Sequence, residues 1–149
     1  VQTCALPILL EAICSLCCQQ MRPARFFTAS SLVMRLRRAR DAGSLDRELS
    51  QLAKADILGI DELGFLPLDN DGARLLFQVI SESYERQSLV ITTNLEFARW
   101  GAVFGDDQMA AAVIDRICHH GRLLKFSGES WRMRHALISG EGTPEGQLA

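Results

Sequence analysis

Two consecutive carboxylates follow a short apolar segment, residues 57–60, and this arrangement constrains the fold more than any other feature of the chain. A short apolar run bounded by polar residues predicts a strand that is buried on both faces, as in a parallel sheet. Ligands of open parallel sheets bind beyond the carboxyl ends of the strands. We therefore expect Asp61 and Glu62 to leave a buried strand at the edge of a binding site.

The two carboxylates can take different roles, because successive residues of a strand point to opposite faces. One can hold Mg²⁺, directly or through a water molecule, while the other polarises an attacking water. Four apolar-type positions followed by Asp-Glu form the Walker B pattern of P-loop ATPases. The alternative is a strand that ends at two solvated acids, and Asp61 and Glu62 alone leave both interpretations open.

A second β-branched segment, residues 89–93, is followed by Asn94. The segment between the two predicted strands is long enough for the helix of a βαβ unit. A neutral amide at the tip of the neighbouring strand can orient a water or contact a γ-phosphate. The alternative for Asn94 is the capping of a turn.

Seven segments, in a fixed order, carry a resemblance to a known family: Arg25–Ala29, Ile60–Leu68, Leu76–Ser81, Ile91–Leu95, Trp100-Gly101, Val103–Asp106 and Asp115-Arg116. From about residue 25 to about residue 137 the chain resembles the IstB-like family. These proteins are AAA+ ATPases that assist the transposases of insertion sequences, and they are similar to the DnaC helicase loaders. Walker B alone is weakly specific, whereas the ordered series is strongly specific.

The resemblance implies an α/β fold, a P-loop NTPase (AAA+) type parallel sheet with flanking helices. It implies that Asp61 serves Mg²⁺, partly through water, that Glu62 activates water, and that Asn94 is the sensor-1 residue. Arg116 resembles an arginine that acts in trans on the nucleotide of a neighbouring subunit. ATP and Mg²⁺ are the implied cofactors, and DNA, a transposase and further copies of the chain are the implied partners. The alternative for Arg116 is a surface ion pair with Asp115 or Asp106.

The chain departs from the family in residues 1–24. A P-loop needs G-x-x-x-x-G-K-[ST], but no glycine precedes Gly43 and no lysine precedes Lys54. We therefore expect the first strand and the Walker A loop to be missing, with residues 9–21 forming the helix that follows this loop in the family. The chain is then either a fragment with a foreign start or a protein that has lost ATP binding, and the close match after residue 25 favours a fragment.

Four arginines crowd the helix predicted to begin after Ser30 or Ser31: Arg35, Arg37, Arg38 and Arg40. They can follow a DNA phosphate backbone, or they can form an ordinary solvated helix face. The formal net charge of −2 gives the whole chain no general attraction to nucleic acid. DNA binding by these arginines is therefore a hypothesis about one helix.

Several further expectations concern the remaining chain. No apolar run approaches the ~20 residues of a membrane span, and five irregularly spaced cysteines favour a reducing cytoplasm over a disulfide scaffold. Cys118-His119-His120 is not expected to bind a metal, because consecutive helical residues point in different directions. Residues 25–138 form the partial ATPase core, in which residues 122–126 are predicted to be a last strand, continued by residues 131–134. Residues 139–149 form a disordered tail.

The resemblance thus implies an ATP-binding, ATP-hydrolysing helper of an insertion-sequence transposase that acts on DNA as an AAA+ oligomer. A DnaC-like replicative helicase loader is the alternative within the same class, because both use the same motor. A nucleotide-dead interaction module is the alternative from another class. The missing Walker A loop leaves open whether the chain itself is an enzyme.

Overall fold

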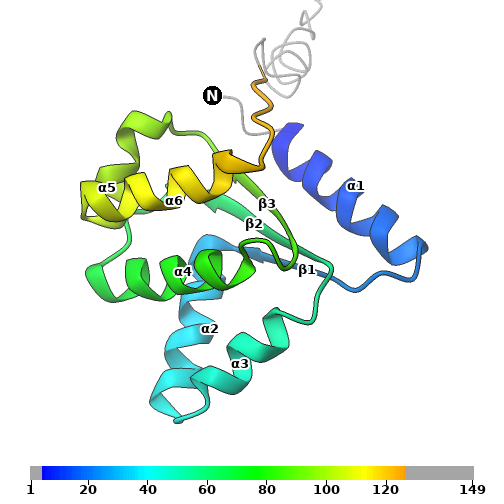
Figure 1. Cartoon of the computed structure of the whole chain (residues 1–149), viewed down its shortest axis with the longest axis horizontal. Coiled ribbons are helices and arrows are strands. Elements are labelled where there is room, and N and C mark those ends of the chain that lie inside the picture. The colour runs from blue at the N-terminus through cyan, green and yellow to red at the C-terminus, as the bar shows by residue number, and fades with distance from the viewer. Residues whose placement is uncertain (1–4, 127–149) are drawn as a thin grey trace, which may run out of the picture.

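Three parallel strands form the sheet at the centre of the molecule (Figure 1). In the computed structural model residues 5–126 are described, with side chains from residue 8 onward. The strands are β1 (Ala24–Thr28), β2 (Ile57–Leu63) and β3 (Ser88–Thr93), in the spatial order β1-β2-β3. Both pairs are parallel, so each pair is joined by a helical crossover, as predicted.

Helices cover both faces of the sheet: α1 (Ala5–Gln19), α2 (Ala29–Asp41), α3 (Leu45–Leu52), α4 (Asn70–Ser83), α5 (Trp100–Phe104) and α6 (Asp107–His119), with a short 3-10 turn, η1 (Phe97–Arg99). Figure 1 shows α1 on one face and the other helices on the opposite face. The α/β class is therefore as predicted. Within residues 5–126 no helix has the length and apolar character needed to cross a bilayer.

The hydrophobic core lies between β2 and the helices on the α2 and α4 face. Leu58 and Ile60 share this face of β2 and are completely buried. Burying a leucine or isoleucine side chain contributes about 1.5–3 kcal/mol. Buried side chains from the surrounding helices complete the core: Leu32, Leu36, Leu52, Leu76, Ile80, Trp100, Phe104 and Val113.

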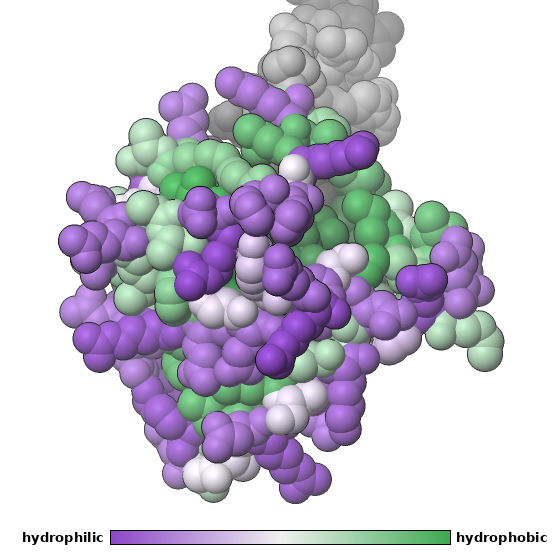
Figure 2. Space-filling view, viewed as in Figure 1, coloured by the Kyte–Doolittle hydropathy of each residue, from purple (hydrophilic) through white to green (hydrophobic). Residues whose placement is uncertain are grey.

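Gly59 faces the other way and lets α1 approach the sheet. A Cβ at this position would lie 2.9 Å from Cδ1 of Leu10, which is the fully buried residue of α1. Leu16 of the same helix remains 55% exposed. In Figure 2 hydrophobic side chains gather over α1, whereas hydrophilic side chains dominate the face over α2, α3 and α4.

Two helices begin at an aspartate cap. Asp69 accepts a hydrogen bond from the backbone N–H of Gly72, and Asp106 caps α6 in the same way. The prediction that Ser30 or Ser31 caps α2 was wrong. Thr28, the last residue of β1, is the cap, because the strand passes directly into the helix.

The predicted strand over residues 122–126 does not form. The chain leaves α6 at His120 and continues as a coil, in which Leu123 and Leu124 are 73% and 64% exposed. A strand needs a neighbour that accepts and donates its backbone hydrogen bonds, and this segment pairs with none of the three strands. The predicted continuation over residues 131–134 and the predicted tail, residues 139–149, lie outside the described residues.

Candidate functional site

The carboxyl ends of β2 and β3 meet at one edge of the sheet, where the pairing becomes irregular. Ile60 pairs with Ile91 and Leu63 pairs with Thr93, so the register shifts across Asp61-Glu62. Glu62 has a φ of +58°, in the left-handed region that non-glycine residues rarely adopt. Such a conformation costs on the order of 1–3 kcal/mol and is concentrated at functional sites.

Asp61 is buried and bound to the neighbouring strand. Its Oδ1 accepts a hydrogen bond from the hydroxyl of Thr92 and a second, of 3.0 Å, from the backbone N–H of Glu62. The same N–H lies 3.1 Å from the Thr92 oxygen, which closes a triangle of three polar groups. Asp61 and Thr92 are only 6% and 7% exposed, so these bonds form away from water. Sequence reasoning missed Thr92, although two threonines ending a strand were a usable signal.

Glu62 and Asn94 are exposed at the ends of β2 and β3. The adjacent Thr93 stabilises the turn after β3, because its hydroxyl donates to the carbonyl of Leu63 at 2.7 Å and accepts from the N–H of Leu95 at 3.1 Å. The side chain of Asn94 makes no hydrogen bond to any described residue. The alternative interpretation of Asn94 as a turn cap is therefore not supported, because Thr93 has this role.

The side chain of Arg116, on α6, contacts other residues of α6 and of α4. Its Nη1 donates to the carbonyl of Ala112 at 2.9 Å, and its guanidinium carbon lies 5.2 Å from the ring centroid of Phe77. Among the described residues it forms no ion pair with Asp115 or Asp106. The surface ion pair considered as its alternative role is thus absent from the described part of the chain. Its action on a neighbouring subunit stays a prediction.

The four arginines of α2 divide into two pairs. Arg37 and Arg40 form ion pairs with Asp69 and Asp71 at the start of α4. The hydrogen bond to Asp71 raises the pKa of Arg40 above its ordinary value. These two side chains therefore link α2 to α4 and share their charge with carboxylates.

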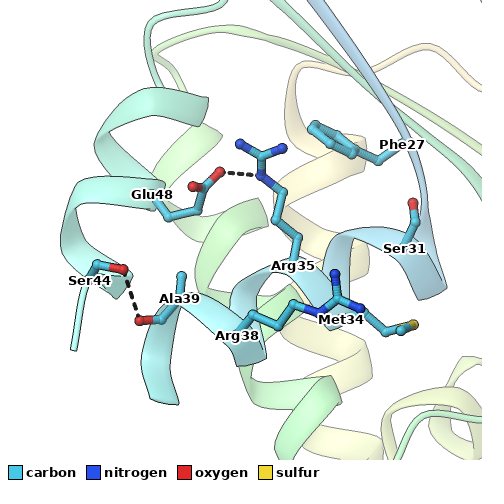
Figure 3. A pocket seen from close by; sticks show the side chains of 8 residues that line it. All are labelled: Phe27, Ser31, Met34, Arg35, Arg38, Ala39, Ser44 and Glu48. Carbon is cyan, nitrogen blue, oxygen red and sulfur yellow. Dashed lines mark hydrogen bonds and ion pairs between the residues drawn. The ribbon is translucent and has the colours of Figure 1, made fainter. Parts of the chain in front are cut away.

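The other pair lines an open groove of about 560 Å³ between α2 and α3 (Figure 3). Arg35 donates to Glu48 and lies 5.6 Å from the ring centroid of Phe27. Arg38 also lines the groove and has no ion pair within residues 5–126. The candidate residues of the β2–β3 edge are not part of this groove.

The described residues suit Mg²⁺ better than they suit the phosphates of ATP. Oδ1 of Asp61 carries both hydrogen bonds, and its second carboxylate oxygen makes none to a described residue, so that oxygen can serve a hard cation. The only lysines are Lys54 and Lys125. Lys54 precedes β2 and so lies at the amino end of the strand, opposite Asp61, while Lys125 lies in the exposed coil after α6. Lys54 is therefore not placed to bind phosphates at this edge.

Comparison with known sequences gives one family. Residues 8–139 match the sequence model of the IstB-like ATP binding protein family. The "Insertion sequence IS5376 putative ATP-binding protein" of Geobacillus stearothermophilus is 41% identical over 78% of this chain and 46% of its own length. The "Insertion sequence IS21 putative ATP-binding protein" of Pseudomonas aeruginosa is 37% identical over 77% and 43%. The chain therefore spans a little less than half the length of these relatives.

Two of the solved structures with a similar fold are replication proteins. The replication initiator DnaA bound to AMPPCP and single-stranded DNA superposes with a TM-score of 0.69 at 13% identity, over 83% of this chain and 37% of DnaA. The DnaC helicase loader superposes with a TM-score of 0.55 at 21% identity, over 69% and 60%. At these identities the likeness concerns the fold alone. The chain belongs to the IstB-like ATP-binding protein family, and its fold is that of the AAA+ P-loop NTPases.

Proposed function

We propose that this chain is the Walker B, sensor-1 and arginine-finger part of an AAA+ ATPase that assists the transposase of an insertion sequence on DNA. The observation that carries the proposal is the hydrogen-bonded junction of Asp61 and Thr92 between β2 and β3. This junction fixes one carboxylate in the sheet and leaves Glu62 exposed beside it. The insertion-sequence context of the relatives supports the transposition role.

The residues at the sheet edge then divide the work. Asp61 holds Mg²⁺ with its second oxygen, in part through water, and the bound ion neutralises charge on the nucleotide phosphates. Glu62 accepts a proton from the attacking water. Asn94 orients that water or contacts the γ-phosphate. The left-handed backbone at Glu62 turns its side chain away from the position that a regular strand would give it.

The 149-residue chain alone is expected to bind ATP weakly, since it has no Walker A sequence. Charge-assisted hydrogen bonds contribute about 1.5–3 kcal/mol each, so three missing ones cost on the order of 5 kcal/mol or more. This is roughly a thousandfold or greater in affinity. Calorimetric titration with Mg·ATP measures it, and a micromolar dissociation constant would contradict the expectation.

The catalytic roles are tested in a chain extended at its amino terminus by a segment with a Walker A loop and its strand. In that protein Glu62→Gln keeps Mg·ATP binding and abolishes turnover, because an amide cannot accept the proton of water. Asp61→Asn weakens Mg²⁺-dependent binding itself. If the Glu62→Gln variant hydrolysed ATP at the rate of the unsubstituted protein, Glu62 would not be catalytic, and the Asp61-Glu62 segment would be only structural.

The trans role of Arg116 is tested by mixing variants of the extended chain. Arg116→Ala alone and Glu62→Gln alone should each hydrolyse almost no ATP, because arginine fingers contribute about 10³ to 10⁵ in rate. A mixed assembly pairs an intact Arg116 of one subunit with an intact Glu62 of another and recovers activity. ATPase activity that stays at the sum of the two variants at every mixing ratio, with mixed assemblies demonstrated, excludes the trans role.

DNA binding is assigned in this proposal to the groove of Figure 3, because Arg35 and Arg38 are the α2 arginines that are not tied to α4. Replacing both with alanine should weaken binding to duplex DNA and reduce the salt dependence by about one unit of slope per lost phosphate contact. Arg86→Ala, at an exposed arginine in the turn after α4, is the matched control. Equal losses in both proteins would contradict the assignment. Whether the extended protein then binds a transposase or a replicative helicase separates transposition from helicase loading.

A further inference from the structure

The carboxyl-terminal ends of α4 and α6 meet on the surface and bring together residues that are far apart in the sequence. Both helices run side by side in the same direction (Figure 1). Tyr84, the C-cap of α4, hydrogen-bonds through its hydroxyl to Nδ1 of His119 at 2.6 Å. His119 is the last residue of α6, and His120 is its C-cap. This junction has no part in the ATPase chemistry proposed above.

Both histidine side chains converge because the helix ends between them. The sequence argument against a metal at Cys118-His119-His120 assumed a continuing helix, in which neighbouring side chains diverge. His120 instead has φ −120° and ψ 9°, outside the helical region. The two imidazole rings consequently approach to a centroid distance of 4.2 Å. Because α6 ends at His119, the expectation that neighbouring helical side chains diverge does not apply to His119 and His120.

Glu85 completes a set of three ligand groups from two segments. Each residue of the set offers one ligand atom, and these three atoms, from Glu85, His119 and His120, lie within 4.8 Å of one another. Oε1 of Glu85 is 3.4 Å from Nε2 of His120. Glu85 has a φ of +59°, so its backbone is held in the left-handed region immediately after α4. Cys118 is also exposed nearby in sequence but is not a member of the set.

The surroundings favour a cation at this place. Each helix ends with about half a negative charge on its last carbonyl groups, and here two helix ends adjoin. The Tyr84 hydroxyl engages Nδ1 of His119, which leaves Nε2 as the free nitrogen of that ring. A hydrogen bond to the second ring nitrogen is the usual support of a metal-binding histidine.

The donor set selects the class of metal. Two imidazoles and one carboxylate suit zinc and its neighbours in the first transition row, whereas Mg²⁺ prefers oxygen ligands alone. Ligands of a tetrahedral zinc with bonds of about 2.1 Å are roughly 3.3 Å apart. The observed 4.8 Å spread therefore requires only a modest closing of three exposed side chains.

We propose that Glu85, His119 and His120 form a binding site for a divalent transition metal of the zinc type, which clamps the end of α4 to the end of α6. Three protein ligands leave the fourth position to water. Because all three ligands are exposed, the site exchanges metal freely with solution.

The test uses the full 149-residue chain under reducing conditions, with Zn²⁺ as the probe. Calorimetric titration gives the affinity and stoichiometry, and NMR of ¹⁵N-labelled imidazole groups identifies the nitrogens that bind. We expect one saturable site, with imidazole signals of His119 and His120 shifting together. His119→Ala, His120→Ala and Glu85→Gln should each weaken binding at least about tenfold. Zn²⁺ should raise the thermal midpoint of the chain, and this rise should be lost in the double histidine variant.

Two controls separate this site from other zinc ligands in the chain. Cys118→Ser tests the neighbouring thiol and should leave the affinity unchanged, as should Glu96→Gln, a change at an exposed carboxylate on a different part of the surface. Mg²⁺ should not move the imidazole signals. The proposal is overturned if no saturable binding occurs at submillimolar Zn²⁺. It is also overturned if the double histidine variant binds as tightly as the unchanged chain, or if Cys118→Ser alone removes binding.

Discussion

Replacing Thr92 with valine tests the junction on which the candidate site depends. Valine has nearly the shape of threonine and an equal preference for strands, so packing in β3 is preserved. The change removes the hydroxyl that donates to Oδ1 of Asp61 and accepts from the N–H of Glu62. It leaves a buried carboxylate with one hydrogen-bond donor in place of two.

The structure sets the size of the effect. A hydrogen bond to a charged group contributes about 1.5–3 kcal/mol, and the burial of both partners keeps water from replacing it. In the variant the N–H of Glu62 still donates to Asp61, so the loss of its contact with Thr92 adds little to the destabilisation. We therefore expect the free energy of unfolding to fall by about 2–3 kcal/mol. At about 3–4 °C per kcal/mol for a chain of this length, the thermal midpoint should fall by roughly 6–12 °C.

Urea denaturation followed by circular dichroism measures this loss, with Ser88→Ala as the matched control. Ser88 is an exposed hydroxyl residue at the start of the same strand, and its replacement should change the stability by less than about 0.5 kcal/mol. A double-mutant cycle with Asp61→Asn should give a coupling energy above about 1 kcal/mol. If Thr92→Val is as stable as the unchanged chain, the hydrogen bond to Asp61 contributes nothing, and the junction does not position the carboxylate.

Three other predictions concern single positions. Gly64→Ala should lower the free energy of unfolding by about 2–4 kcal/mol, because the φ of Gly64 is +87° and a Cβ there would lie 2.5 Å from a neighbouring side-chain carbon. The control is Gly43→Ala: Gly43 has a φ of +67° but open space around it, so the loss should be only about 1 kcal/mol. A backbone N–H in the first turn of α4, and the nearby arginine, hold the pKa of Asp69 below its ordinary value. This stabilisation is present above the ordinary carboxyl pKa and is lost as pH falls through the lowered one, so Asp69→Asn, which still caps the helix, should show a smaller loss of stability between about pH 5 and pH 2 in urea titrations. Arg116→Ala should cost about 0.5–1 kcal/mol through its contact with Phe77, and a double-mutant cycle with Phe77→Leu should recover that coupling.

The strands β2 and β3 and their parallel arrangement were predictable because they depend on short-range patterns. An apolar run that ends in Asp61-Glu62, followed by a segment of helix length and a β-branched run, predicts a parallel crossover arrangement. The helix starts at Asp69 and Asp106 depend on contacts of equally short range, since a cap acts within three residues. The start of α2 was predicted wrongly because Thr28 is both the last residue of β1 and the N-cap of α2.

The polar contacts of the site were not predictable, because they join residues about thirty positions apart. Thr92 meets Asp61 only after β2 and β3 pair, and the register shift at Glu62 depends on that pairing. The periodicity of a sequence describes one helix or strand at a time, so it cannot predict a register shift between two strands. The same limit explains residues 122–126, which were predicted to be a strand although, within residues 5–126, they pair with none of the three strands.

The arginines of α2 show how a tertiary contact changes the meaning of a sequence pattern. As a sequence cluster, four arginines on one helix can follow a DNA phosphate backbone or form an ordinary solvated face. The acidic start of α4 takes up two of them, because Asp69 and Asp71 face Arg37 and Arg40 once the helices pack. Releasing those two for DNA would break their ion pairs with the start of α4. The proposed DNA contact keeps these ion pairs if it uses the groove side of α2, where Arg35 lies beside the ring of Phe27 and Arg38 lines the same groove.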